Sequence, residues 1–123
     1  MRSIVEKRSY GSVTVFWLDR AEALRRLREA AGKAITARPE VLAIHLFGSL
    51  AEGRAVPGSD ADLLILLERS DRRWLDRPLD YSSYFEGLGL PVELLCYTVE
   101  EAEANPVARR AMERGLLLAE RPD

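Results

Sequence analysis

Two apolar runs of strand length, separated by a polar loop, limit most strongly what this chain can fold into. The first run is VLAIHLF, residues 41–47, and the second follows two aspartates in DADLLILLE, residues 60–68. Apolar residues without alternation are typical of a strand that is covered on both faces of a sheet. The stretch AEGRAVPGS between the runs contains glycine and proline, which mark a loop. The sequence therefore predicts two central strands of a sheet, joined by a loop at one end.

Propensity, periodicity and capping signals predict further elements around these strands. β-branched and aromatic residues indicate strands, apolar residues at helical spacing indicate helices, and Ser, Thr, Asp or Asn before them indicates N-caps. Before the central strands we expect a hairpin of residues 4–10 and 12–18 around Gly11, and a helix over 20–36 capped by Asp19 with Glu22. After them we expect a helical segment from Ser70 that Pro78 interrupts and that continues to Gly87, and a strand over 91–98. A short helix with Thr98 and Glu101 as capping box follows, and a last helix starts at Asn105 and ends at Gly115.

Length, charge and cysteine content exclude several classes of protein. With 123 residues, of which 47% are hydrophobic and 31% charged, the chain has the size and composition of one globular domain. A net charge of −2 argues against a general nucleic-acid-binding role, which needs a basic face. No apolar run is long enough for a membrane span or a signal peptide, and the single cysteine, Cys96, excludes an internal disulfide and a cysteine-based zinc site. We expect one cytoplasmic domain, without membrane binding or strong nucleic-acid binding.

Asp60 and Asp62 stand at the start of the second apolar run. Side chains alternate along a strand, so both carboxylates project to the same side, with backbones roughly 6.6 Å apart at about 3.3 Å per residue. Like charges at this spacing repel each other unless a cation lies between them. Mg²⁺ is the expected occupant, because it prefers oxygen ligands and is often held by one or two carboxylates plus substrate phosphates. The simpler alternative is a solvated turn after Gly58.

Glu93 and the pair Gly48 and Ser49 extend this candidate site. Alternation in PVELLCYT puts Glu93 on the face opposite to the cysteine, and beside the Asp60 strand it would complete a three-carboxylate cluster. Such a cluster can hold two metal ions for an in-line phosphoryl or nucleotidyl displacement. Gly48 and Ser49 follow the first strand, where bare N–H groups and a hydroxyl can face an anion. An edge-strand salt bridge for Glu93 and a turn hydroxyl for Ser49 are the alternatives.

The motif GSLAEG, followed after five residues by SDADL, resembles the G-S-x(3)-G-x(5)-S-D-x-D signature of the polymerase-β-like nucleotidyltransferases. At this length the chain looks like the minimal nucleotidyltransferases that are paired with HEPN-domain proteins. The resemblance covers residues 42–97. It implies an α+β nucleotidyltransferase fold in a single domain over 1–123, with a mixed three-stranded sheet flanked by helices. The core would span about residues 19–118, with residues 1–18 as an N-terminal strand extension.

The resemblance also implies a reaction and a partner. Family members of this kind act as antitoxins that silence a HEPN ribonuclease by transferring AMP from ATP to one of its tyrosines. A HEPN-type toxin is therefore the expected partner, ATP the expected substrate and Mg²⁺ the expected cofactor, with two ions. The implied roles are nucleotide binding by Gly48, Ser49 and Ser59, and metal binding and catalysis by Asp60, Asp62 and Glu93, with Glu93 as ligand or as base.

Other interpretations stay open. Leu50 occupies a position that is often basic in this family, and Glu93 one that is more often aspartate, so the main alternative is a non-catalytic antitoxin that neutralises its partner by binding. Nucleotidyl transfer to a small molecule or an RNA end is a third interpretation. The apolar run VTVFWL, residues 13–18, predicts an exposed edge that a second copy or the partner covers. His45 lies inside the first apolar run, where a core or rim position is expected rather than catalysis.

Overall fold

The computed structural model describes residues 3–122. Its elements in chain order are β1 (Val5–Tyr10), β2 (Val13–Leu18), α1 (Arg20–Ala37), β3 (Val41–Phe47), β4 (Ala61–Leu67), the 3₁₀ helices η1 (Trp74–Asp80) and η2 (Ser82–Phe85), β5 (Val92–Thr98), α2 (Val99–Ala104), α3 (Pro106–Arg114) and β6 (Leu116–Glu120). Among these residues, no helix combines the length and the apolar character that crossing a membrane requires.

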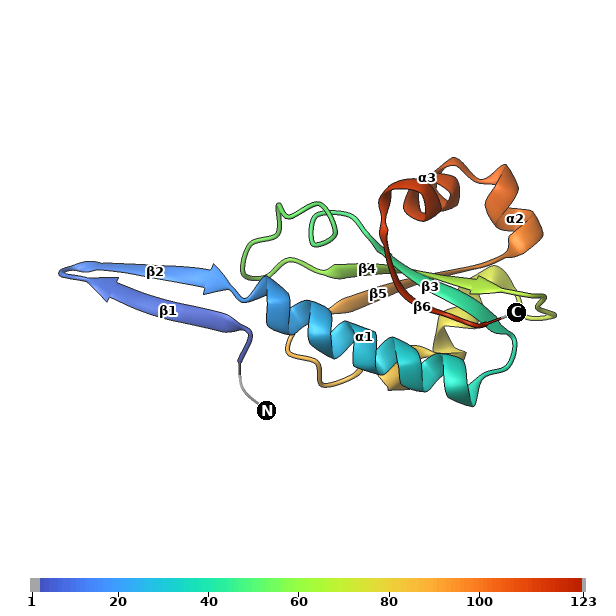
Figure 1. Cartoon of the computed structure of the whole chain (residues 1–123), viewed down its shortest axis with the longest axis horizontal. Helices are drawn as coiled ribbons and strands as arrows, with labels where there is room; N and C mark the ends of the chain where they lie inside the picture. Colours follow the sequence, from blue (N-terminus) through green and yellow to red (C-terminus); the bar gives the residue numbers. More distant parts are fainter. Residues whose placement is uncertain (1–2, 123) are drawn as a thin grey trace.

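The main sheet has four strands in the order β5, β4, β3, β6. β3 is antiparallel to both of its neighbours, whereas β4 and β5 are parallel. The predicted α+β fold, a mixed sheet flanked by helices, is confirmed (Figure 1). The expected three strands are one too few, because the chain after Gly115 returns along the free edge of β3 as β6.

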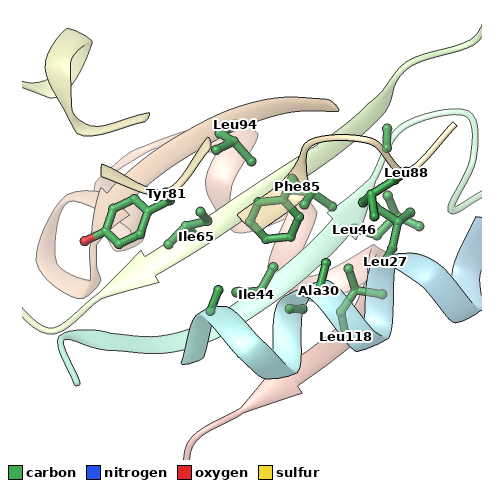
Figure 2. Close-up of a cluster of buried hydrophobic side chains, with 14 of the residues drawn as sticks. Leu27, Ala30, Ile44, Leu46, Ile65, Tyr81, Phe85, Leu88, Leu94 and Leu118 are labelled. Carbon is green, nitrogen blue, oxygen red and sulfur yellow. The ribbon is translucent and has the colours of Figure 1, made fainter. Parts of the chain in front are cut away.

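The two apolar runs form the inner strands β3 and β4, and both faces of these strands are covered. α1 lies along one face of the sheet, and α2 and α3 lie along the other (Figure 1). Figure 2 shows the core on the α1 side, where α1, the sheet and the segment before β5 contribute Leu27, Ala30, Ile44, Leu46, Ile65, Tyr81, Phe85, Leu88, Leu94 and Leu118. A smaller cluster under α2 and α3 contains Leu64, Ala102, Ala108 and Ala111. This double cover explains why neither central strand alternates between apolar and polar residues.

The segment between β4 and β5 differs from its prediction. It forms η1 and η2 instead of an interrupted α-helix. Pro78 has no N–H group to donate within a helix, and the backbone uses three-residue bonds instead, such as Tyr81 N–H to the Pro78 carbonyl at 3.1 Å. Tyr81 and Phe85 of this segment are both buried in the core, whereas Leu75 and Leu79 are exposed.

β1 and β2 pair as the predicted antiparallel hairpin and project away from the sheet (Figure 1). The base of the hairpin is fixed: Ile4 is buried in the core, and its carbonyl accepts a hydrogen bond of 2.6 Å from the Asp19 N–H. Its outer part carries apolar side chains that are more than half exposed, including Phe16 and Trp17. The structure thus leaves the run VTVFWL largely exposed, in agreement with the expectation from its sequence.

Arg77 is a buried cation that joins η1 to β5 and α2. Its guanidinium donates to the carbonyls of Arg72 and Cys96 and to the Glu101 carboxylate, at 3.0, 3.2 and 2.6 Å. Glu101 is also the third residue of the capping box that Thr98 opens, as predicted. The hydrogen bond from Arg77 lowers the pKa of Glu101 to about 2.

This ion pair predicts how stability changes in acid. A carboxyl group whose pKa is lower in the folded than in the unfolded chain stabilises the fold above its unfolded pKa and loses this effect as it is protonated. The wild type should therefore lose stability relative to Glu101→Gln as the pH falls from 4.5 to about 2. Gln can still accept the capping bond, so the substitution changes mainly the charge. Urea unfolding between pH 7 and pH 2 measures the difference. Glu100→Gln, an exposed change on the same helix, is the control, and an equal pH dependence of wild type and Glu101→Gln would contradict the prediction.

Candidate active site

The end of β3 brings the predicted phosphate-binding pair against a predicted carboxylate. Gly48 has a φ of +78°, a conformation that favours glycine. A Cβ atom at Gly48 would overlap the Oδ2 atom of Asp62. Glycine is therefore required here both by the backbone conformation and by the close approach of the Asp62 carboxyl group. The predicted neighbours Gly48 and Asp62 are in contact in the fold.

The chain after Gly48 forms a compact turn. The N–H groups of Glu52 and Arg54 donate to the carbonyls of Gly48 and Ser49 at 3.1 and 2.9 Å. For the N–H groups of Ser49, Leu50 and Ala51, no acceptor is found within residues 3–122. Successive backbone N–H groups in a turn provide a binding site for anions. The turn thus offers backbone donors at the place where the sequence predicts the phosphate site.

Arg20, at the start of α1, holds this turn from the other side. Its guanidinium donates to the carbonyls of Leu50 and Ala51 at 2.9 and 3.0 Å. The sequence analysis missed this residue. A signal exists, because a cation in the first turn of a helix opposes the helix dipole and so needs another reason to be there.

Substituting Arg20 tests whether the turn depends on this clamp. Arg20→Gln should lower the free energy of unfolding by about 1–3 kcal/mol, because it leaves half-buried carbonyl groups without their charged donor. If the turn binds the nucleotide that the sequence resemblance implies, Arg20→Gln should also raise the KM for that nucleotide, since the turn is then less firmly held. The matched control is Arg28→Gln, an exposed arginine on the same helix. Equal urea unfolding curves and equal KM values for both variants would show that the turn forms without Arg20.

The three predicted carboxylates lie at one end of β4 and β5. Asp60 directly precedes β4, Asp62 is its second residue, and Glu93 pairs with Asp62 in the parallel register of β4 and β5. Paired residues of neighbouring strands project to the same face, here the face that α2 and α3 cover. Val92, Leu94 and Cys96 lie on the opposite face, as the alternation predicted, and pack in the core on the α1 side. The structure therefore brings Asp60, Asp62 and Glu93 to one place.

The electrostatics of this cluster favour a cation. Asp62 is half-buried, and its pKa is raised first by burial and then by the charges of Glu93 and Asp60. Within the described part of the chain, no lysine, arginine or histidine nitrogen lies within 4.0 Å of any of these three carboxylates. Negative charge is thus concentrated without a protein counter-ion, and carboxylate oxygens are the ligand type that Mg²⁺ prefers.

The three carboxylates are not arranged as a complete metal site of their own. No group of three or more His, Cys, Asp or Glu side chains among residues 3–122 is arranged to hold a metal ion. Mg²⁺ commonly takes only one or two carboxylates, together with substrate phosphates. The donor type of these residues therefore fits Mg²⁺ only if one or two of the carboxylates bind it together with ligands from outside the chain.

Ser59 has a structural task in addition to its predicted role. Its hydroxyl oxygen accepts a hydrogen bond of 3.0 Å from the Val56 N–H, and its own N–H donates to the Val56 carbonyl at 2.9 Å. These bonds close the turn that leads into Asp60. The hydroxyl hydrogen is not used in them, so Ser59 can still donate to a nucleotide.

A cleft of about 300 Å³ opens beside Gly48, between the turn and α3. It is lined by Phe47, Gly48, Ala51, Glu52, Arg54, Val107, Arg110, Ala111, Arg114 and Gly115. Three arginines and one glutamate give it a basic lining. No signal in the sequence places the arginines of α3 beside the turn.

Comparison with known proteins decides the family. The model of the nucleotidyltransferase domain matches residues 24–118, which is most of the chain. The chain belongs to the nucleotidyltransferase domain family. The fold of this nucleotidyltransferase is also similar to the crystal structure of a candidate nucleotidyltransferase from Sulfolobus solfataricus, with a TM-score of 0.63 and 19% identity over 83% of this chain and 84% of the other. No curated protein matches the sequence significantly. Family membership supports nucleotidyl transfer as the general reaction.

Proposed function

We propose that this nucleotidyltransferase transfers AMP from ATP to a hydroxyl group of a partner protein, with Mg²⁺ as cofactor. The observation that carries the proposal is the meeting of Asp60, Asp62 and Glu93 beside the turn of Gly48 and Ser49. Nucleotidyl transfer needs a site for phosphates and a site for the metal that accompanies them. Here the two sites share a contact between Gly48 and Asp62.

The three carboxylates would have different roles in the reaction. Asp60 and Asp62 would hold Mg²⁺, with Glu93 as a further ligand or as the base for the acceptor hydroxyl. When bound, Mg²⁺ supplies positive charge that stabilises the attacking and leaving oxygens of an in-line displacement. The acceptor oxygen forms a bond to the α-phosphorus, the bond from that phosphorus to the β-phosphate oxygen breaks, and pyrophosphate leaves. The proton of the acceptor hydroxyl passes to Glu93 or to water.

The position of Glu93 supports a protein as acceptor. β5 is an edge strand of the main sheet, and Glu93 is exposed on it. An acceptor can therefore approach from an open surface, as a folded partner must. A tyrosine of a HEPN-type ribonuclease is the acceptor we propose, in line with the resemblance to minimal nucleotidyltransferases, so that the chain acts as an antitoxin.

A labelling experiment tests this function. The purified protein is incubated with each α-labelled nucleoside triphosphate and Mg²⁺ in lysate of its source cells and, separately, with a co-purified HEPN protein. The control is the double variant Asp60→Ala/Asp62→Ala. We expect label from ATP on one protein band, lost in the double variant. Label only on RNA or a small molecule would contradict the protein acceptor. Absence of label while a partner still co-purifies would favour a binding module without catalysis.

A further inference from the structure

α3 presents one stripe of residues to the cleft beside Gly48. Val107, Arg110, Ala111 and Arg114 are spaced as neighbours on one helix face, and all four line the cleft. Arg109 lies on the same helix but does not line this cleft, and its guanidinium lies 3.9 Å from the Glu113 carboxylate. It lines two other hollows, one of which it shares with Arg110 and Arg114. One face of α3 thus directs two arginines toward the phosphate-binding turn.

Gly115 fixes where these arginines lie. A Cβ atom at Gly115 would overlap the carbonyl oxygens of Ala111 and Leu46, so the end of α3 packs directly on the backbone of β3. Leu46 lies two residues before Gly48. Arg114 is therefore held beside the end of β3 by a close backbone contact that only glycine permits.

Of the charged groups that line the cleft, Arg54 and Glu52 contact each other, whereas the arginines of α3 do not take part in such a pair with any described residue. Arg110 and Arg114 have no hydrogen bond or ion pair with any residue that the structure describes. Glu52 contacts Arg54, and its pKa is lowered first by the hydrogen bond from Arg54 and further by the charges of Arg110 and Arg114. Glu52 and Arg54 are both exposed. Exposed pairs contribute little to stability, so a more highly charged anion can displace the Glu52 carboxylate.

Leu50 does not contribute to this charge. Its side chain is buried in the core, so it anchors the turn to the rest of the domain by packing. It therefore cannot face a phosphate. The positive charge near the turn comes instead from Arg54 and from α3.

The order of the strands places the cleft on the side of the candidate site that is opposite to Glu93. Glu93 lies on β5, Asp62 on β4 and Gly48 at the end of β3, and α3 packs on β3 and β6 beyond them. In an in-line displacement the attacking and leaving oxygens lie on opposite sides of the phosphorus. If the acceptor enters beside Glu93, the leaving group points toward the cleft.

We propose that Arg110 and Arg114 of α3 bind the β- and γ-phosphates of the nucleotide, and that Glu52 is an internal anion which the phosphates must displace. This inference rests on the proposed nucleotidyl transfer. The released pyrophosphate keeps the same contacts until it leaves. Glu52 thereby lowers the affinity for the nucleotide, because its carboxylate occupies the place where the phosphates bind.

Binding measurements on the whole chain test both parts. The probes are the non-transferable analogue α,β-methylene-ATP and AMP, each with Mg²⁺, and the readout is the dissociation constant from titration calorimetry. Arg110→Gln/Arg114→Gln should weaken binding of the analogue at least about tenfold, because charged hydrogen bonds are lost. Its affinity for AMP should be unchanged. Glu52→Gln should tighten binding of the analogue several-fold. Arg109→Gln is the control on the same helix and should bind like the wild type.

The outcomes separate this inference from the proposed function. If the wild type binds the analogue and the double arginine variant binds it equally well, the assignment of α3 is wrong and nucleotidyl transfer stands. An equal loss in Arg109→Gln would show an effect of overall charge, which also overturns the assignment. If Glu52→Gln binds the analogue as tightly as the wild type or more weakly, Glu52 does not compete with the phosphates. A wild type that binds no nucleotide would contradict both proposals.

Discussion

Replacing Asp62 by asparagine is expected to lower the rate of nucleotidyl transfer by at least about 10³-fold, or about 4 kcal/mol in the activation free energy. Asp62 is the carboxylate that contacts Gly48 and that Asp60 and Glu93 face, so its loss removes the centre of the proposed metal site. Asparagine has nearly the same shape, and the contact with Gly48 is kept. The loss should therefore come from charge and not from packing.

The same substitution should not weaken the fold. Burial and two neighbouring carboxylates raise the pKa of Asp62, which means that its charged form is disfavoured in the folded chain. Neutral asparagine removes this cost, so the melting temperature of Asp62→Asn should equal or exceed that of the wild type near pH 7. A metal that stabilises the wild type should have less effect on the variant.

Transfer assays and thermal unfolding, each with and without Mg²⁺, check this prediction. The exposed change Asp71→Asn is the control for a lost carboxylate outside the site. Transfer at the wild-type rate by Asp62→Asn would refute the role of the cluster. A clear loss of melting temperature would show instead that Asp62 is needed for the fold.

The parts that could be predicted from sequence are those that local periodicity decides. A nearly continuous apolar run identifies each of β3 and β4, and alternation along a strand places Asp60, Asp62 and Glu93 on one face. Glycine before a polar loop identifies the turn at Gly48. Each of these inferences uses residues that are close in the chain, or strands that lie side by side once a parallel pair is assumed.

The parts that could not be predicted depend on residues that are distant in sequence. Arg20 reaches Leu50 across 30 positions, and nothing in either local stretch specifies this contact. The arginines of α3 look like a solvated helix face, because only the close packing of Gly115 on β3 brings them to the cleft. β6 was missed because a short apolar run at the end of a chain has no period that separates strand from other structures.

Replacing Gly48 by alanine is expected to have the second large effect, through two separable causes. Its positive φ costs a residue with a Cβ atom about 1–2 kcal/mol. The added methyl group would also overlap Asp62 Oδ2 and push either the carboxylate or the turn aside. We expect a total loss of about 2–4 kcal/mol in the free energy of unfolding. Transfer should fall by about 100-fold, because the carboxylate proposed to bind the metal and the turn proposed to bind the phosphates are displaced together.

Gly53 provides the matched control for this substitution, because it lies in the same loop and has nearly the same backbone conformation. Its φ is +76°, but a Cβ atom there would meet nothing within 4 Å. Gly53→Ala should therefore lose only the conformational part, about 1–2 kcal/mol, and should keep most of its transfer activity. Urea unfolding and transfer rates of the two variants separate strain from overlap. If both variants lose the same stability and the same activity, the contact between Gly48 and Asp62 has no role of its own. A larger loss of activity in Gly48→Ala alone would support the proposal that phosphate site and metal site work as one unit through this contact.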